Sequence, residues 1–141
     1  TFFLTQTVAR SMIAAPESEA IAVYRSVVTI TSANADIVGL NRADYCMTKS
    51  ALSMASKLFA SRLAGHGIHV FEVRPGIIAT DMTAPAAAVY DTLIENDGVP
   101  LHRWGQPQDV GATVATIAQG LLPFATGEVI NVGGGLHLHR V

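Results

Sequence analysis

Short strand-like runs alternate with longer helical segments along the 141 residues, and this order constrains the fold more than any other feature. The runs over 26–31, 68–73 and 128–132 are rich in β-branched residues and suit strands covered on both faces. We expect helices around them, over 2–15, 43–64 and 89–96 and from Pro107 onward. Since no repeat or long linker interrupts this order, the sequence predicts a single α/β unit with a parallel sheet.

Ser32, Tyr45 and Lys49 form a set with the chemistry of carbonyl reduction and alcohol oxidation. Ser32 ends the first strand-like run, and Tyr45 and Lys49 lie four residues apart on the next helix, so they share one of its faces. An ammonium beside a phenol stabilises the phenolate, which makes tyrosine a better proton shuttle near neutral pH. Ser32 would fix and polarise the substrate oxygen. Thr31 offers a neighbouring hydroxyl, but successive strand residues point to opposite faces.

The stretch over 29–82 resembles the second half of a short-chain dehydrogenase/reductase. The similarity includes the serine, tyrosine and lysine above, the sequence Arg74-Pro75-Gly76-x-x-x-Thr80, and a closing motif over 126–135. It extends over essentially all 141 residues and is greatest for members of the 3-oxoacyl-carrier-protein reductase type. The spacing in that family selects Ser32 rather than Thr31. The resemblance implies a Rossmann-like, doubly wound parallel sheet.

The resemblance also implies the roles of individual residues. The catalytic residues would be Ser32, Tyr45 and Lys49, and the cofactor would be NAD or NADP. Residues implied to bind it are Tyr45, Lys49, Pro75, Gly76, Ile78 and Thr80. Ile78 would offer backbone groups and Thr80 a hydroxyl. We expect no metal site, because the five histidines lie in unrelated contexts without Cys or carboxylate at ligand spacing.

No Gly-rich strand-to-helix turn of the G-x-x-x-G-x-G kind precedes Ser32. In a dinucleotide-binding fold that turn belongs to the first of two βαβαβ halves and cradles the pyrophosphate. Residues 1–141 are therefore expected to be the C-terminal half of a single dinucleotide-binding catalytic domain. By the resemblance, a catalytic Asn and the residues that select NAD or NADP are expected upstream of Thr1 as well.

The length and composition agree with a piece of a soluble enzyme, with 50% hydrophobic and 14% charged residues and a net charge of −2. The nine Lys and Arg are scattered, which argues against nucleic acid or an anionic membrane as a partner. The single cysteine, Cys46, excludes an internal disulfide and is compatible with the cytoplasm. Neither a membrane span nor a signal peptide is visible.

The helix expected over 43–64 carries more apolar surface than one contact needs. It has two apolar stripes side by side, and packing on the sheet needs only one of them. One stripe consists of Met47, Ala51, Met54 and Leu58, and the other consists of Leu52, Ala55, Phe59 and Leu63. In the resembled family this helix also packs against its counterpart in another subunit, which favours a homodimer or homotetramer. Packing against the missing front half is the alternative.

We therefore expect an NAD(P)-dependent oxidoreductase that interconverts a ketone and a secondary alcohol, with Tyr45 as proton donor and acceptor. A dinucleotide-sensing or regulatory protein on the same fold, or an inactive fragment of the enzyme, is the alternative. The small-molecule carbonyl substrate stays open, because the segment after Thr80 offers only an apolar wall. An acyl chain, a sugar-derived ketone or a small cyclic ketone would suit that wall, formed by Met82, Val89, Tyr90, Leu93 and Ile94.

Overall fold

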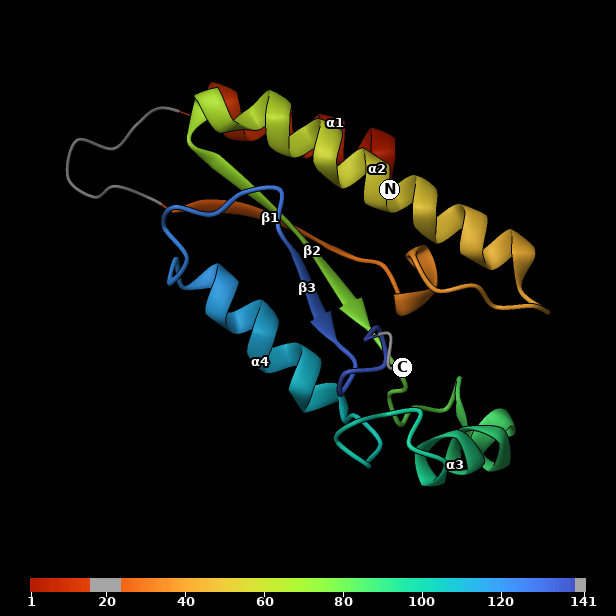
Figure 1. The fold of residues 1–141 in the computed structure, drawn as a ribbon. Coiled ribbons are helices and arrows are strands. Elements are labelled where there is room, and N and C mark those ends of the chain that lie inside the picture. The colour runs from red at the N-terminus through yellow and green to blue at the C-terminus, as the bar shows by residue number, and fades with distance from the viewer. Residues whose placement is uncertain (16–23, 139–141) are drawn as a thin grey trace.

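The computed structural model describes residues 1–15 and 24–138, in which helices and strands alternate as the sequence predicts (Figure 1). The strands in this part are β1 (Arg25–Ile30), β2 (Ile68–Pro75) and β3 (Val129–Val132). The α-helices there are α1 (Phe2–Ala14), α2 (Ala43–Leu63), α3 (Ala87–Glu95) and α4 (Pro107–Ala118), and the 3₁₀ turns are η1 (Ala33–Ala35), η2 (Ala64–His66) and η3 (Ala84–Ala86). The predicted bounds of the strands and helices are correct to within two residues.

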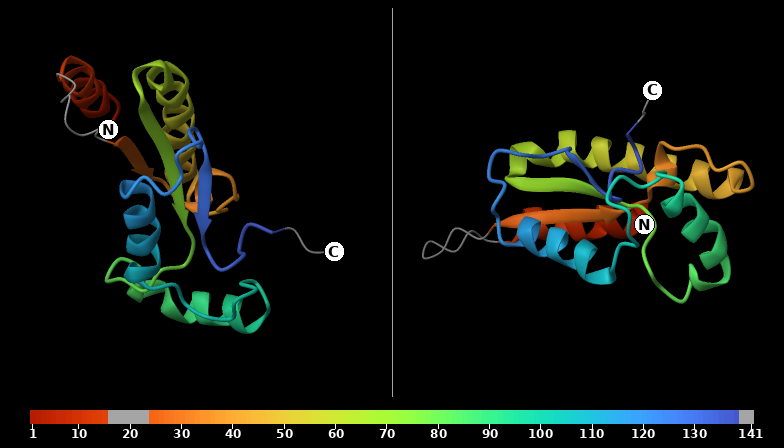
Figure 2. Two further views of the ribbon diagram at one scale, coloured as in Figure 1. Left: turned by 90° about the vertical axis from the view of Figure 1, so that its left-hand side faces the viewer. Right: turned by 60° about the horizontal axis from the view of Figure 1, so that its bottom comes forward.

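The three strands form a parallel sheet in the order β1-β2-β3, with Ile30 opposite Val73 and Val73 opposite Ile130. Helices α1 and α2 cover one face of the sheet and α4 covers the other (Figures 1 and 2). The predicted doubly wound arrangement is therefore confirmed. Because each connection between parallel strands crosses over through helices, the carboxyl ends of the three strands meet at one edge. Helix α3 lies beyond that edge (Figure 1).

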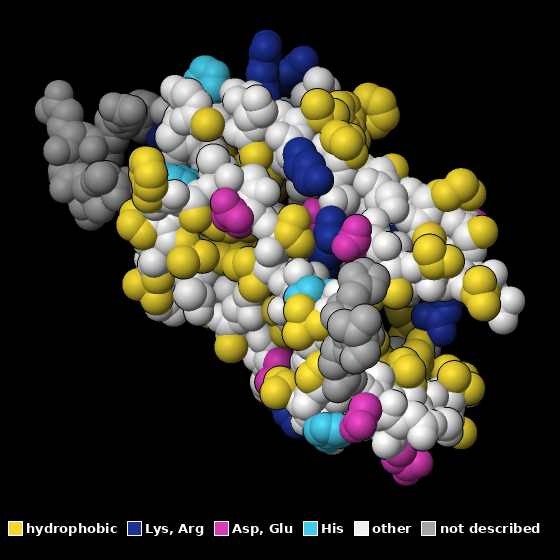
Figure 3. Space-filling view, viewed as in Figure 1, with side chains coloured by type: hydrophobic (Ala, Val, Ile, Leu, Met, Phe, Trp, Pro, Cys, Tyr) yellow, Lys and Arg dark blue, Asp and Glu magenta, His cyan; other side chains and the backbone are white. Residues whose placement is uncertain are grey.

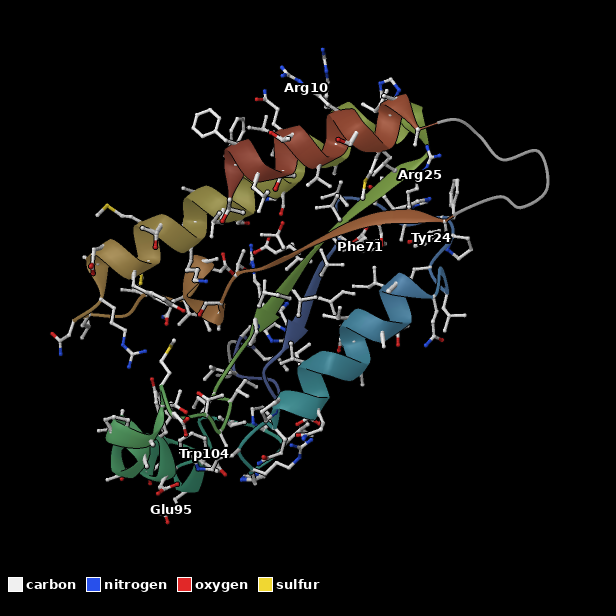
Figure 4. The ribbon with its side chains drawn as sticks, turned by 180° about the vertical axis from the view of Figure 1, so that it is seen from behind. Arg10, Tyr24, Arg25, Phe71, Glu95 and Trp104 are labelled. Carbon is white, nitrogen blue, oxygen red and sulfur yellow. The ribbon has the colours of Figure 1, made fainter. Side chains whose placement is uncertain are left out.

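Among the described residues, the central strand β2 supplies most of the large side chains that are fully buried, since its residues face the two helical layers alternately. Val70 packs towards α1 and α2, whereas Phe71 packs with Ile117 of α4 (Figure 4). All three side chains are at most 1% exposed. Among the described residues, no helix combines the length and the apolar character needed to cross a bilayer.

Helix α2 meets the sheet with small side chains rather than with large aliphatic ones. Its buried residues are Ser53, Ser56, Ala60 and Leu63. The helix runs into η2 and ends at Gly67, whose φ of 65° is a left-handed conformation that glycine adopts readily. The reversal at Gly67 leads directly into β2, so α2 lies along the sheet with its first turns near the carboxyl ends of the strands (Figure 1).

Candidate active site

Ser32 lies just beyond the carboxyl end of β1, where the chain enters η1. Its hydroxyl oxygen accepts a hydrogen bond of 3.1 Å from the Asn34 N–H, so the turn fixes the oxygen and leaves the hydroxyl proton for another acceptor. The side chain of Thr31, by contrast, is buried and donates to Glu72 Oε1 at 2.6 Å. This internal contact occupies Thr31 and supports Ser32 as the hydroxyl of the site.

Tyr45 and Lys49 lie on one face of the first two turns of α2. The Lys49 Nζ is 5.5 Å from the centroid of the Tyr45 ring, a distance at which a cation is attracted to an aromatic face. The tyrosine side chain is 37% exposed, and the lysine is half-buried. A substrate could therefore reach the phenol, and the ammonium of Lys49 stands beside the same ring.

A hydrogen bond joins the turn that follows Ser32 to the helix that carries Tyr45 and Lys49. Ser50 Oγ donates to the carbonyl oxygen of Ala35 at 2.8 Å, which closes the loop over 36–42 at its base. The amide of Asn34 stabilises the same loop by donating to the Ile37 carbonyl at 3.0 Å. The three predicted catalytic residues therefore stand on two adjacent segments, at the edge where the strands end.

The Pro75-Gly76 turn ends β2 at the same edge. The Gly76 N–H donates to the Val132 carbonyl at 3.0 Å, and the two backbones run very close together there. A Cβ on Gly76 would lie 2.7 Å from the Cα of Gly133, which is closer than real Cβ contacts come. Glycine is required for this approach, and the turn presents backbone groups where ligands of open α/β sheets bind.

Replacing Gly76 by alanine is expected to lower the free energy of unfolding by about 1–3 kcal/mol, because the added methyl group meets backbone that cannot move aside cheaply. Thermal or denaturant unfolding of the full-length protein measures the loss. Gly111→Ala in α4 is the matched control, since its Cβ would meet nothing within 4 Å. Equal stability of the Gly76→Ala protein and the wild type would show that the turn is more adaptable than its geometry indicates.

Ile78 and Thr80 follow the turn and differ in how they could meet a ligand. Ile78 is buried, so only its backbone is available, and its carbonyl already accepts from Thr83 Oγ1 at 2.7 Å. Thr80 is exposed, and its N–H donates to the same Thr83 oxygen at 3.0 Å. Thr83 thus holds both residues in place. A hollow of about 420 Å³, bounded partly by Thr80, Thr83 and Trp104, lies beside them.

Comparisons with known proteins show the family of this chain. Residues 2–137 match the family model of enoyl-(acyl carrier protein) reductase. The chain belongs to the short-chain dehydrogenase/reductase family. It is 33% identical over 114 residues to the 3-oxoacyl-[acyl-carrier-protein] reductase of Staphylococcus epidermidis, and the alignment covers 80% of the chain and 46% of that protein.

Solved structures of the family resemble the chain closely. A 3-oxoacyl-[acyl-carrier-protein] reductase from Brucella melitensis in complex with NAD is 48% identical, with a TM-score of 0.94 over 99% of this chain and 54% of that one. A putative 2-deoxy-d-gluconate 3-dehydrogenase from Agrobacterium tumefaciens with bound NADP is 28% identical, with a TM-score of 0.83 over 96% and 53%. The chain therefore spans about half the length of the relatives that it matches.

For a short-chain dehydrogenase/reductase, the donors at this edge fit a nicotinamide cofactor. The ammonium of Lys49 can donate to sugar hydroxyls, and the hydroxyl of Thr80 and the backbone of Ile78 can pair with a carboxamide. Within residues 1–15 and 24–138, no group of three or more His, Cys, Asp or Glu is placed to hold a metal ion.

Helix α3 is attached to the helix of Tyr45 by a contact that local sequence patterns do not reveal. Arg42, at the start of α2, donates from Nη2 to the Tyr90 hydroxyl at 2.6 Å, and its guanidinium lies 5.7 Å from the centroid of that ring. The sequence predicts an apolar wall in the segment after Thr80, and two of its members, Met82 and Val89, are largely exposed. Ile94 is instead buried in a cluster with Ile77 and Val99, so it cannot line a substrate site.

The segment between α3 and α4 is bound to both helices by its residues 103 and 104. Trp104 Nε1 donates to Asp91 Oδ1 at 2.7 Å, in the middle of α3, which ends at Glu95 (Figure 4). Arg103 donates to both carboxylate oxygens of Asp109, at 2.8 and 3.1 Å, in the first turn of α4. Hydrogen bonds from Arg103 and from the Gln106 N–H lower the pKa of Asp109 to about 2. An ionised carboxylate at this position is also favoured by the positive end of the helix dipole.

Glu72 is the principal polar residue that the sequence motifs miss. Its side chain is 1% exposed in the middle of β2, and its carboxylate is surrounded by donors from three elements. The signal was present in the sequence, because a charged residue inside a strand that is covered on both faces needs a partner. Ser53 of α2 is one such partner.

Proposed function

We propose that this chain supplies the second half of the catalytic domain of an NAD(P)-dependent oxidoreductase, which interconverts a ketone and a secondary alcohol. The observation that carries the proposal is the placement of Ser32, Tyr45 and Lys49 on adjoining segments at the carboxyl edge of the sheet, beside the Pro75-Gly76 turn. The lengths of the relatives and their names as reductases and dehydrogenases support it.

The proposed reaction combines two transfers, in which a hydride goes to the carbonyl carbon of the substrate and a proton goes to its oxygen. The nicotinamide cofactor, when bound, would supply or take up the hydride at the carbonyl carbon of the substrate. Ser32 holds the substrate oxygen with its free hydroxyl proton, and Tyr45 donates a proton to that oxygen as negative charge develops on it. Lys49 stabilises the phenolate that is left and holds the ribose hydroxyls of the cofactor. In the reverse direction Tyr45 accepts the proton of the alcohol.

Either nicotinamide dinucleotide suits the proposal, since one similar structure contains NAD and another NADP. Pro75, Gly76, Ile78 and Thr80 would contact the nicotinamide end. Carbonyl substrates with an apolar part fit best, because the segment after Thr80 exposes the side chains of Met82 and Val89 and part of Leu93. Acyl-chain and sugar-derived ketones are the substrate classes that the names of the relatives suggest.

The test is a turnover assay of the full-length protein with NADH and with NADPH. A panel of a 3-oxoacyl thioester, a keto-gluconate and a small cyclic ketone is added, and the loss of reduced nicotinamide absorbance is followed. Turnover with at least one member supports the proposal. Tight dinucleotide binding without turnover of any ketone, and without oxidation of the corresponding alcohols, would instead favour a sensing or regulatory protein.

We also propose that the protein is a homodimer or homotetramer that pairs through α2. The outer side of this helix is rich in hydrophobic side chains (Figure 3), of which Met47, Met54 and Leu58 are 67%, 55% and 59% exposed. Exposed apolar surface of this kind marks interaction sites. The second apolar stripe of α2, which includes Phe59, packs inside the chain instead. The ring centroids of Phe59 and Phe2 are 5.1 Å apart.

Leu58→Arg is expected to dissociate the oligomer, because it places an unpaired charge within the apolar stripe. Analytical ultracentrifugation of the full-length protein measures the mass of the variant and of the wild type. Lys57→Gln, which changes the charge of an exposed neighbour on the same helix, should keep the wild-type mass. An unchanged mass for Leu58→Arg would assign the stripe to contacts with another part of the same protein.

A further inference from the structure

The carboxylate of Glu72 receives a hydrogen bond from each of three structural elements. Thr31, just after β1, donates to Oε1 at 2.6 Å, and Ser53 of α2 donates to Oε2 at 2.7 Å. Arg74, on β2 itself, donates from Nε to Oε1 at 2.7 Å and from Nη2 to Ser53 Oγ at 2.8 Å. The four side chains form one closed network between the sheet and α2.

Each donor adjoins a residue of the proposed site. Thr31 immediately precedes Ser32, Ser53 lies one helical turn after Lys49, and Arg74 immediately precedes Pro75-Gly76. Glu72 is therefore the point at which the three segments that carry the hydroxyl, the ammonium and the backbone turn are joined. Side chains four apart on a helix lie on the same face, so the contact at Ser53 also fixes the rotation of α2 near Lys49.

Glu72 is charged in this network. Burial alone would raise the pKa of its carboxyl group, but hydrogen bonds from Arg74, Thr31 and Ser53, together with the charge of Arg74, outweigh burial and lower the pKa. Hydrogen bonds to an ionised acceptor are shorter and stronger than neutral ones, so the three segments are held more firmly than by neutral contacts. Arg74 also approaches Asp36, in the loop after Ser32, with 3.7 Å between Nη1 and Oδ2.

Stability alone does not account for this arrangement. A buried ion pair is often replaced by apolar side chains of similar volume without loss of stability, and Val70 and Ile68 on the same face of β2 are apolar. What an apolar residue cannot do is fix the direction and distance of three separate donors. Catalysis is sensitive to the exact positions of the reacting groups, since displacement of such a group by about 1 Å can cost on the order of a hundredfold in rate.

We propose that Glu72 is a positioning residue that holds Ser32, Lys49 and the Pro75-Gly76 turn in their working arrangement through Thr31, Ser53 and Arg74. The proposal rests on the function proposed above for the same site. Glu72 itself touches neither substrate nor cofactor. Its effect is on the geometry in which the proton and the hydride are transferred.

The test begins with Glu72→Gln in the full-length protein, which keeps the shape of the side chain and removes its charge and one acceptor. We expect kcat to fall by about ten- to hundredfold, with a much smaller change in the KM for ketone and in the dissociation constant of the dinucleotide. Ile117→Val is the matched control. It loosens the packing of β2 from the opposite face and should leave kcat near the wild-type value.

A second pair of variants separates positioning from packing. Thr31→Val removes the donor with little change of volume, whereas Thr31→Ser keeps the hydroxyl. The valine variant should lose turnover and the serine variant should recover most of it. If Glu72 acts through Thr31, the double variant Glu72→Gln/Thr31→Val should be little slower than Glu72→Gln alone, because both changes break the same contact.

Hydrogen exchange provides a readout that does not depend on turnover. In Glu72→Gln, the amides of Asn34 and Gly76 should exchange faster relative to that of Phe71, because the segments around Ser32 and the turn are no longer tied to the carboxylate. If the wild type reduces no ketone, the function proposed above fails, and exchange alone then decides the role of Glu72. Unchanged exchange at both amides, or a kcat no lower than that of an Ile117→Val protein of equal melting temperature, would overturn the proposal.

Discussion

Replacing Tyr45 by phenylalanine in the full-length protein is expected to lower kcat for ketone reduction by roughly 10²- to 10⁴-fold, the usual contribution of a positioned general acid. The change removes one oxygen atom and leaves the ring, which lies 5.5 Å from Lys49 Nζ, in place. Dinucleotide affinity should therefore stay close to that of the wild type. Steady-state turnover and calorimetric titration with NADH or NADPH measure the two quantities.

Tyr24→Phe is the matched control for this experiment. Tyr24 precedes β1 at the opposite end of the sheet and stacks on His69 with the ring centroids 5.0 Å apart, so loss of its hydroxyl should not affect turnover (Figure 4). A Tyr45→Phe protein that retained a tenth or more of wild-type turnover would fall outside the range for loss of a general acid. Tyr45 would then have no role in the proton transfer.

Much of the fold could be predicted from the sequence, because local patterns determine it. The β-branched runs mark strands that are covered on both faces, and β1 and β2 begin and end close to those runs. Gly67 marks the end of the long helix, since its left-handed φ of 65° suits glycine. The parallel direction follows from the helix between successive strands, which leaves no short hairpin connection.

The grouping of the candidate site residues at one edge of the sheet was also predictable, for reasons of geometry. Tyr45 and Lys49 share a helix face because they are four residues apart. Ser32 and Gly76 follow two neighbouring strands, and the carboxyl ends of parallel strands lie at one edge. The choice of Ser32 over Thr31 is supported by the burial of Thr31, whose hydroxyl is used by Glu72.

The contacts that hold the site together were not predictable, because they join residues far apart in the sequence. Arg42 and Tyr90 are separated by 48 positions, and Thr31 and Glu72 by 41. No periodicity or motif reports such pairs. Only the register of the strands, with Ile30 opposite Val73, brings Thr31 beside Glu72. Likewise Ile94 follows the helical pattern of an apolar wall, but the fold of the segment buries it with Val99.

Lys49→Ala is expected to lower both turnover and dinucleotide affinity, because the ammonium is assigned two tasks. Loss of the charge beside the Tyr45 phenol should reduce kcat by roughly 10²-fold or more, as for a general acid that has lost its activating partner. Loss of the donor to the ribose hydroxyls should weaken dinucleotide binding by about 1.5–3 kcal/mol, or roughly ten- to hundredfold. Stopped-flow turnover and calorimetric titration separate the two effects.

Two further lysine variants isolate the cause of each loss. Lys57→Ala, at an exposed position two turns further along α2, removes the same side chain away from the site and should change neither quantity. Lys49→Arg keeps a positive charge but replaces a compact ammonium by a planar guanidinium of different reach. It should therefore retain more turnover than Lys49→Ala while still binding dinucleotide less tightly than the wild type. If Lys49→Ala lowered turnover with unchanged affinity, the lysine would act on Tyr45 alone and the ribose hydroxyls would be held elsewhere.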